Sequence, residues 1–251
     1  MRTVAVVQAR MSSTRLPGKV MLEVLGKPMI LLMLERVARC KRLDDLWLAT
    51  SEEAADDPLA EAVQKAGYRV FRGSLNDVLS RFWHIARREK ADGVVRLTGD
   101  CPLHDPSVID AVVEHFLRNQ PGHDYVSNCL PPTYPDGLDT EVFTLEALDE
   151  AFRRAESSFD REHVTPYISR RAASAGRTSN FHGLSDFSHL RWTLDQSEDY
   201  ELIRRVYQDL YPDKADFGWL DVLAWQTRDP ERLQINAKYK RNEGVQETTA
   251  S

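Results

Sequence analysis

Short apolar segments alternate with amphipathic segments through the first 120 residues of this 251-residue chain. The apolar segments have the length and the valine and leucine content of buried strands, and the amphipathic segments repeat their apolar residues at helical spacing. This alternation predicts an α/β fold, in which a Rossmann-like, doubly wound and mostly parallel sheet carries helices on both faces. The expected strands are residues 4–7, 45–50, 68–71 and 93–97, and the expected helices are 27–39, 58–66, 75–89 and 106–117.

The pattern changes after about residue 120, where four prolines interrupt regular structure between positions 121 and 135. Beyond them we expect helices at residues 145–156, 161–173, 198–210 and 219–227, and strands at 178–182 and 189–194. We interpret residues 1–240 as one domain with a small accessory lobe. The polar end of the chain, from Asn236 and especially over 241–251, is expected to be a loose tail.

A polar, basic loop follows the first expected strand. It places Arg10, Arg15 and Lys19 within ten residues, among small residues such as Ser13. Small residues let backbone N–H groups approach anionic oxygens, and the cations neutralise their charge, so the loop suits a polyphosphate. The alternative is an ordinary solvated loop. It is less favoured because three cations share one loop and no acidic residue follows until Glu23.

Two aspartates, Asp100 and Asp195, each follow a segment that is expected to be a strand. Ligands bind at the carboxyl ends of the strands in open α/β sheets, so Asp100 would lie beside the basic loop. Either aspartate could instead cap a helix, but Asp105 and Ser197 stand closer to the expected helix starts. Two carboxylates from distant positions can hold Mg²⁺ together with phosphate oxygens, so we take Asp100 and Asp195 as candidate metal ligands.

Composition and missing motifs argue against several classes of protein. The net charge of −6 does not favour a nucleic-acid-binding surface, and the longest apolar stretch, residues 28–34, is too short to span a bilayer. The polar residues from Gln8 onward argue against a secretion signal, and three widely spaced cysteines favour reduced thiols in the cytosol. The Walker and Gly-x-Gly-x-x-Gly patterns and the Gly-x-Ser-x-Gly nucleophile elbow are absent from the sequence.

The motifs resemble those of the bacterial sugar cytidylyltransferases. Residues 8–20, Gln-Ala-Arg-Met-Ser-Ser-Thr-Arg-Leu-Pro-Gly-Lys-Val, and Gly-Lys-Pro at 26–28 are similar to the start of the CMP-octulosonate synthetases and of the acylneuraminate and pseudaminate cytidylyltransferases. The most similar branch is that of the spore coat polysaccharide biosynthesis cytidylyltransferases. Thr-Gly-Asp-Cys-Pro-Leu at 98–103 resembles the metal-binding motif of the family, and the resemblance covers nearly the whole chain.

The resemblance implies the nucleotide-diphospho-sugar transferase fold, with residues 1–120 binding the nucleotide and 121–235 binding the acceptor and forming a dimer. It implies that Mg²⁺ is the cofactor and that Asp100 and Asp195 hold it. The implied catalytic residues are Arg15, Lys19, Asp100 and Asp195. The implied nucleotide-binding residues are Gln8, Ala9, Arg10, Ser13, Arg15, Lys19, Arg72 and Ser74, and the implied acceptor-binding residues are Asn128, Asp139, Glu141 and His163.

Some of these assignments have structural alternatives. Ser74 stands where it could equally cap the following helix. The acceptor-side polar residues, such as Asp139 and His163, could equally order their own loop through internal hydrogen bonds.

These features predict an enzyme that transfers CMP from CTP to an acidic sugar or related acceptor and releases pyrophosphate, for surface polysaccharide biosynthesis. The choice of CTP and of a homodimer rests on the resemblance alone. One alternative is a nucleotide-sugar-dependent glycosyltransferase of related fold, although no Asp-x-Asp motif stands at a strand end. Another is a nucleotidyltransferase that uses a different nucleotide, or a phosphonate or polyol-phosphate acceptor. We expect a cytoplasmic protein with no nucleic-acid or membrane partner.

Overall fold

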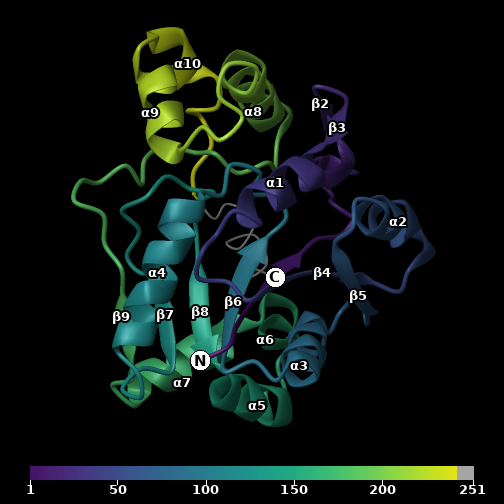
Figure 1. The fold of residues 1–251 in the computed structure, drawn as a ribbon, viewed down its shortest axis with the longest axis vertical. Coiled ribbons are helices and arrows are strands. Elements are labelled where there is room, and N and C mark those ends of the chain that lie inside the picture. Colours follow the sequence, from purple (N-terminus) through teal and green to yellow (C-terminus); the bar gives the residue numbers. More distant parts are fainter. Residues whose placement is uncertain (242–251) are drawn as a thin grey trace.

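A computed structural model describes residues 1–241, which contain a seven-stranded sheet, a two-stranded hairpin and helices on both faces of the larger sheet (Figure 1). The strands are β1 Thr3–Gln8, β2 Glu23–Val24, β3 Lys27–Pro28, β4 Asp45–Ser51, β5 Arg69–Gly73, β6 Gly93–Thr98, β7 Tyr125–Ser127, β8 Glu141–Thr144 and β9 Thr178–Asn180. The helices are α1 Met29–Val37, α2 Asp57–Lys65, α3 Val78–Glu89, α4 Pro106–Arg118, α5 Leu145–Arg154, α6 Ser158–His163, α7 Thr165–Ser174, α8 Ser197–Leu210, α9 Trp219–Thr227 and α10 Pro230–Gln234, with 3-10 turns η1 Lys19–Met21 and η2 Ala54–Asp56.

The large sheet has the strand order β5-β4-β1-β6-β8-β7-β9. The strands β5, β4, β1 and β6 are mutually parallel, and β8 alone runs antiparallel to its neighbours in the part of the sheet that the structure describes. The expected α/β fold with a mostly parallel, doubly wound sheet is therefore confirmed. The strand order reverses between β1 and β6. Strands β4 and β5 are added on the side of β1, and the later strands β8, β7 and β9 are added on the side of β6.

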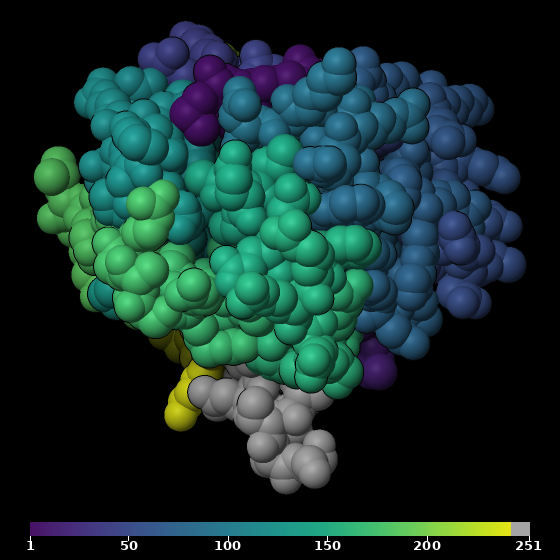
Figure 2. Space-filling model, turned by 90° about the horizontal axis from the view of Figure 1, so that it is seen from below, coloured from purple at the N-terminus to yellow at the C-terminus, as the bar shows by residue number. Residues whose placement is uncertain are grey.

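The central strand β1 is buried on both faces. Its Val4 and Val6 pack in one core cluster with the apolar side of α3, whereas Ala5 and Val7 pack in a second cluster with α1 and α4. A parallel strand covered by helices on both faces needs apolar residues at successive positions, which accounts for the unbroken apolar run in the sequence. Seen from below, α5 and α7 form the green surface next to the blue α3 (Figure 2).

Helices α8, α9 and α10 form the small accessory lobe at the top of Figure 1. A third core cluster joins this lobe to the domain, because Trp192 and Leu194 pack with Leu202 of α8, Val222 of α9 and Met29 of α1. The lobe thereby fixes the segment 190–195, which carries one of the two candidate metal ligands.

Two sequence expectations in the second half are wrong. Residues 189–194 do not form a strand: their contact of strand type is a single bridge between Arg191 and Asp136, because this segment pairs with loops rather than with a neighbouring strand. The helix expected at 161–173 is divided into α6 and α7 at Val164, which has a φ of 69°. Between residue 120 and the helix that begins at residue 145, where no strand was expected, the chain also forms the short strands β7 and β8, which pair with each other and with β9 and β6.

The end of the described chain is packed rather than loose. Asn236 is buried, and its side-chain amide donates hydrogen bonds to the carboxylate of Asp199 and to the carbonyl oxygen of Arg191, each at 2.9 Å. Arg241 forms an ion pair with Asp139. Residues 242–251 of the expected loose tail lie outside the described residues. No helix in the described range is long and apolar enough to cross a membrane.

Candidate active site

A cavity of about 830 Å³ opens at the carboxyl ends of β1 and β6. These two strands meet where the strand order reverses, which is the place where open α/β sheets bind ligands. Eleven of the fourteen residues that the sequence predicted for the site line the cavity: Gln8, Ala9, Arg10, Ser13, Arg15, Lys19, Asp100, Asp139, Glu141, His163 and Asp195. The other three, Arg72, Ser74 and Asn128, are not among its lining residues.

Gly99 lets the loops that follow β1 and β6 approach each other. Its backbone N–H donates to the carbonyl oxygen of Gln8 at 2.8 Å. A Cβ atom at this position would lie 2.6 Å from the Cβ of Ala9, which is too close for any residue but glycine without movement of the backbone. The glycine thus places Asp100 directly beside the basic loop.

The start of the basic loop is anchored by Asp56, a residue that sequence reasoning missed. This buried carboxylate accepts hydrogen bonds from the backbone N–H of Met11 at 2.6 Å and from the hydroxyl of Thr50 at 3.0 Å. Burial alone would raise the pKa of Asp56, but the hydrogen bonds from Met11, Ser51 and Thr50 hold it below its ordinary value. In the sequence Asp56 stands just before a helix, so it has the pattern of an ordinary cap.

The two candidate metal ligands converge on one lysine. The Nζ of Lys19 lies 2.8 Å from Asp100 Oδ2 and 2.8 Å from Asp195 Oδ1, and a terminal nitrogen of Arg15 lies 2.8 Å from the same Asp195 oxygen. The carbonyl oxygen of Asp100 also accepts the N–H of Leu194 at 2.7 Å and the hydroxyl of Thr193 at 3.1 Å. Backbone and side-chain bonds therefore bring residues 95 positions apart to the same point, although the segment before Asp195 is not a strand.

The charges at this point are strongly coupled. Burial alone would lower the pKa of Lys19, but the carboxylates of Asp100 and Asp195 raise it above its ordinary value. Burial alone would likewise raise the pKa of Asp100, but the ammonium of Lys19 holds it well below its ordinary range. Asp100 is thus ionised at neutral pH in the presence of Lys19. Two carboxylates that face a common point are the oxygen donors that a hard divalent cation prefers.

The cations of the basic loop are not surrounded by open solvent. Lys19 contacts Asp100 and Asp195, Arg15 contacts Asp195, and Arg10 lies 3.1 Å from Glu162 of α6. The sequence offered no acidic residue near this loop, but the fold brings acidic residues to it from three distant segments. Each cation therefore has a defined position on the cavity wall before any ligand binds.

The acceptor-side residues divide into two kinds. Glu141 and Asp139 line the cavity, and each pairs with an arginine, Arg96 and Arg241 respectively. His163 also lines the cavity, and burial lowers its pKa. Asn128, by contrast, is fully buried: its amide donates to the carbonyl oxygen of Leu138 at 2.9 Å and accepts the N–H of Thr140 at 2.8 Å. Asn128 therefore orders the loop rather than facing the cavity.

Arg72 and Ser74 are not among the residues that line the cavity. Arg72 donates to the carbonyl oxygen of Ser51 at 2.9 Å and pairs with Asp57 at 2.6 Å. The hydroxyl of Ser74 accepts the N–H of Asp77, and Asp77 rather than Ser74 caps α3. The structure gives these two residues roles in the local backbone, so it does not bring them to the site that the sequence predicted for them.

Three arginines that the sequence-based list did not include also line the cavity: Arg81, Arg96 and Arg191. Arg81 is buried, donates to the carbonyl oxygens of Ser74 and Leu75, and has a pKa that burial lowers to about 10. In the sequence Arg81 was only a weaker candidate, on the helix that follows Arg72, and Arg191 had no signal beyond its charge. Arg96 stands in β6, the strand that Asp100 follows, and this position was the available clue.

Comparison with known proteins decides the family. A cytidylyltransferase family model matches residues 4–215. The chain belongs to the cytidylyltransferase family. It is therefore a nucleotidyltransferase.

Two curated relatives and one solved structure show how far this cytidylyltransferase is similar to others. It is 33% identical to the spore coat polysaccharide biosynthesis protein SpsF of Bacillus subtilis, over 90% of this chain and 94% of that protein. It is 30% identical to the 8-amino-3,8-dideoxy-manno-octulosonate cytidylyltransferase of Shewanella frigidimarina, over 72% of this chain and 69% of that protein. A solved cytidylyltransferase from Leptospira borgpetersenii has a TM-score of 0.89 and 34% identity, and the match covers 95% of this chain and 99% of that chain. The α/β nucleotidyltransferase fold expected from the sequence is confirmed.

Proposed function

We propose that this cytidylyltransferase transfers CMP from CTP to a hydroxyl of an acidic sugar or related acceptor, with release of pyrophosphate, in the biosynthesis of a surface polysaccharide. The observation that carries the proposal is that the side chains of Lys19, Asp100 and Asp195 meet in the cavity. Arg15, which lines the same cavity, pairs with Asp195. Cations and paired carboxylates at one point suit a reaction in which negative charge develops on phosphate oxygens.

In this proposal the basic loop holds the triphosphate. Arg15 and Lys19 donate charge-assisted hydrogen bonds to the β and γ phosphates, and backbone N–H groups near Ser13 add neutral ones. The carboxylates that pair with these cations in the unliganded protein, Asp100 and Asp195, would then be available to hold a metal ion. Binding of the nucleotide therefore exchanges one set of ion pairs for another, and the cations need little movement because they already lie on the cavity wall.

Asp100 and Asp195 would hold a divalent cation, which we propose is Mg²⁺. The donor set fits, because both are carboxylates and both lie 2.8 Å from one Lys19 nitrogen. No group of three or more His, Cys, Asp and Glu side chains that could hold a metal occurs within residues 1–241, so phosphate oxygens and water would complete the coordination. When bound, the ion would neutralise charge on the α phosphate and lower the pKa of a bound hydroxyl.

We expect CTP to be preferred over UTP, ATP and GTP, because the chain belongs to a family of cytidylyltransferases. Pyrophosphate release should be measured with each nucleotide and with 3-deoxy-manno-octulosonate, its 8-amino derivative and N-acetylneuraminate as acceptors. The expected result is release that needs both CTP and a sugar acid. Equal or faster release with UTP or GTP would place the enzyme in another class of nucleotidyltransferase, and release with only a phosphonate or polyol phosphate would replace the acceptor.

We further propose that the enzyme is a cytoplasmic homodimer, a proposal that rests on the resemblance to the sugar cytidylyltransferases. Light scattering coupled to size-exclusion chromatography tests this proposal, since it measures the molar mass of the particle in solution. One chain has a mass of 28.7 kDa. A mass near twice that value is expected at micromolar concentration. A mass of one chain at all concentrations tested would contradict the dimer and leave the catalytic proposal unaffected.

A further inference from the structure

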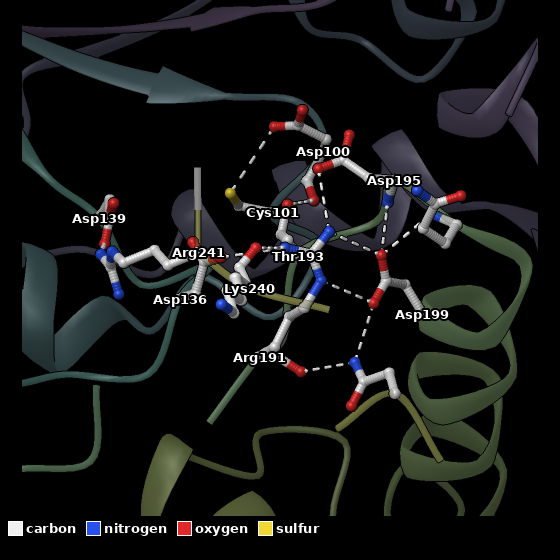
Figure 3. Close-up of polar contacts among 12 residues, drawn as sticks. Asp100, Cys101, Asp136, Asp139, Arg191, Thr193, Asp195, Asp199, Lys240 and Arg241 are labelled. Atoms are coloured by element: carbon white, nitrogen blue, oxygen red, sulfur yellow. Dashed lines mark hydrogen bonds and ion pairs between the residues drawn. The ribbon is translucent and has the colours of Figure 1, made fainter. Parts of the chain in front are cut away.

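Arg191 links the candidate metal ligands to the acceptor side of the cavity. One of its terminal nitrogens lies 3.3 Å from Asp136 Oδ2, and the other lies 3.2 Å from Asp195 Oδ2. In Figure 3, Asp136 and Asp139 lie on one side of this guanidinium, and Asp195 and Asp199 lie on the other. Asp136 and Asp195 are therefore separated by the width of one guanidinium group, and both line the cavity.

The position of Arg191 is fixed by its surroundings. Asp199 accepts hydrogen bonds from two of its nitrogens, each at 3.0 Å, and the carbonyl oxygen of Lys240 accepts a third at 3.1 Å. Asn236 binds the backbone oxygen of Arg191 and the carboxylate of Asp199. The last described segment of the chain thus holds Arg191 in one orientation, and Arg191 in turn orients the two carboxylates beside it.

The backbone of Asp136 is fixed equally well. Its N–H donates to the carbonyl oxygen of Leu190 at 2.9 Å, and its own carbonyl oxygen accepts the N–H of Trp192 at 2.6 Å. The next residue, Gly137, has a φ of 105°, and a Cβ there would lie 2.7 Å from the backbone of Trp192. A residue with a side chain would push the two segments apart, so glycine keeps Asp136 against the segment that carries Asp195.

We infer that Asp136 is a catalytic residue of the proposed transfer, in which it binds the attacking hydroxyl of the acceptor and receives its proton. The acceptor oxygen forms a bond to the α phosphorus of CTP, and the bond between that phosphorus and the bridging oxygen of pyrophosphate breaks. Pyrophosphate leaves with the electron pair, and the hydroxyl proton moves to the Asp136 carboxylate. This inference rests on the proposed function, since it takes CTP and an acceptor hydroxyl as substrates.

The charged surroundings of Asp136 suit this role. Burial raises its pKa to about 7, and the neighbouring carboxylates of Asp139 and Asp100 also raise it. Arg241 and Arg191 lower it, but each of these arginines is shared with other carboxylates. A base is most effective when its pKa is near the working pH, because it is then ionised and still binds a proton well. Below about pH 7 Asp136 holds a proton and cannot accept another, so activity should fall on the acid side.

Asp136→Asn tests the inference, because it keeps the shape of the side chain and removes its basicity. With CTP and 8-amino-3,8-dideoxy-manno-octulosonate or 3-deoxy-manno-octulosonate, kcat should fall roughly 100-fold or more. The KM for CTP should change little, and the loss of activity near pH 7 should disappear from the pH profile. Asp139→Asn is the matched variant. It removes a negative neighbour, so it should move that loss to lower pH without abolishing it.

A second measurement does not depend on the acceptor. The carboxyl carbon resonance of Asp136, assigned by comparison of labelled wild-type protein with Asp136→Asn, should titrate near pH 7. Titration below pH 5, or an Asp136→Asn variant that keeps the wild-type pH profile, would overturn the inference. A wild-type enzyme that releases no pyrophosphate from CTP with any sugar acid tested would contradict the proposed function instead, while the titration would still report on Asp136.

Discussion

Replacing Lys19 by alanine is expected to lower kcat/KM for CTP by about 100- to 1,000-fold. Lys19 is buried, and it is the one cation that contacts both Asp100 and Asp195 among the described residues. The substitution removes a charge-assisted phosphate contact worth roughly 1.5–3 kcal/mol and takes from Asp100 the lysine with which it forms its ion pair, whereas Asp195 keeps Arg15 and Arg191. Arg15→Ala should have a smaller effect in the same direction, because Arg15 is more exposed and contacts only Asp195.

The control for Lys19→Ala is Lys27→Ala. Lys27 is a half-exposed lysine that pairs with Glu35 on α1, outside the cavity. Its removal should leave kcat/KM nearly unchanged. Initial rates of pyrophosphate release and thermal unfolding should be measured for the three variants. If Lys19→Ala and Arg15→Ala both had near-normal rates and normal unfolding, the basic loop would have no role in binding the triphosphate.

Replacing Asp100 or Asp195 by asparagine is expected to abolish most of the divalent-cation-dependent activity. An amide is a poorer ligand than a carboxylate for a hard cation, so each variant should need a much higher Mg²⁺ concentration to reach half-maximal rate. The effects of the two substitutions should not add in the double variant, because removal of either carboxylate already disrupts the same ion. Activity should therefore be measured against Mg²⁺ concentration for both single variants and the double variant.

Asp105→Asn is the control for this series. Asp105 lies close to Asp100 in sequence but caps α4 and accepts the N–H of Trp219 at 2.7 Å, so its effect should be on stability rather than on the Mg²⁺ requirement. Full wild-type activity in excess chelator would show that the reaction needs no divalent cation. An Asp195→Asn variant with an unchanged Mg²⁺ requirement would leave Asp195 only as the partner of Lys19 and Arg15.

The nucleotide half of the fold could be predicted from the sequence because its signals are local. The strands β1, β4 and β6 are short, mostly buried apolar runs, whereas β5 is a partly buried edge strand, and each of the four precedes a helix in the chain. The basic loop and Asp100 follow two of these strands, so the rule that ligands bind at the carboxyl ends placed them together correctly. Asp105 was likewise a recognisable cap, and it does cap α4.

The acceptor half could not be predicted as well, because its structure depends on contacts between distant segments. Asp195 reaches Asp100 through hydrogen bonds from residues 193 and 194 to the Asp100 carbonyl, not through the strand that its apolar neighbours indicated. Arg191 owes its role to carboxylates on two segments, with Asp136 on one and with Asp195 and Asp199 on the other. Nothing in the local sequence distinguishes such an arginine from a solvated one. Arg72 shows the opposite error. Its place near the end of a strand indicated a ligand-binding residue, but its guanidinium binds the backbone oxygens of Ser51 and Glu53.

The most direct test of the central claim is identification of the product. The enzyme should be incubated with CTP, Mg²⁺ and each sugar acid of the panel, and the products analysed by mass spectrometry and ³¹P NMR. We predict a conjugate with the mass of CMP joined to the acceptor and a single phosphodiester resonance, formed together with one equivalent of pyrophosphate. CTP that stays intact with every acceptor tested, or a conjugate that contains another nucleotide, would contradict the account.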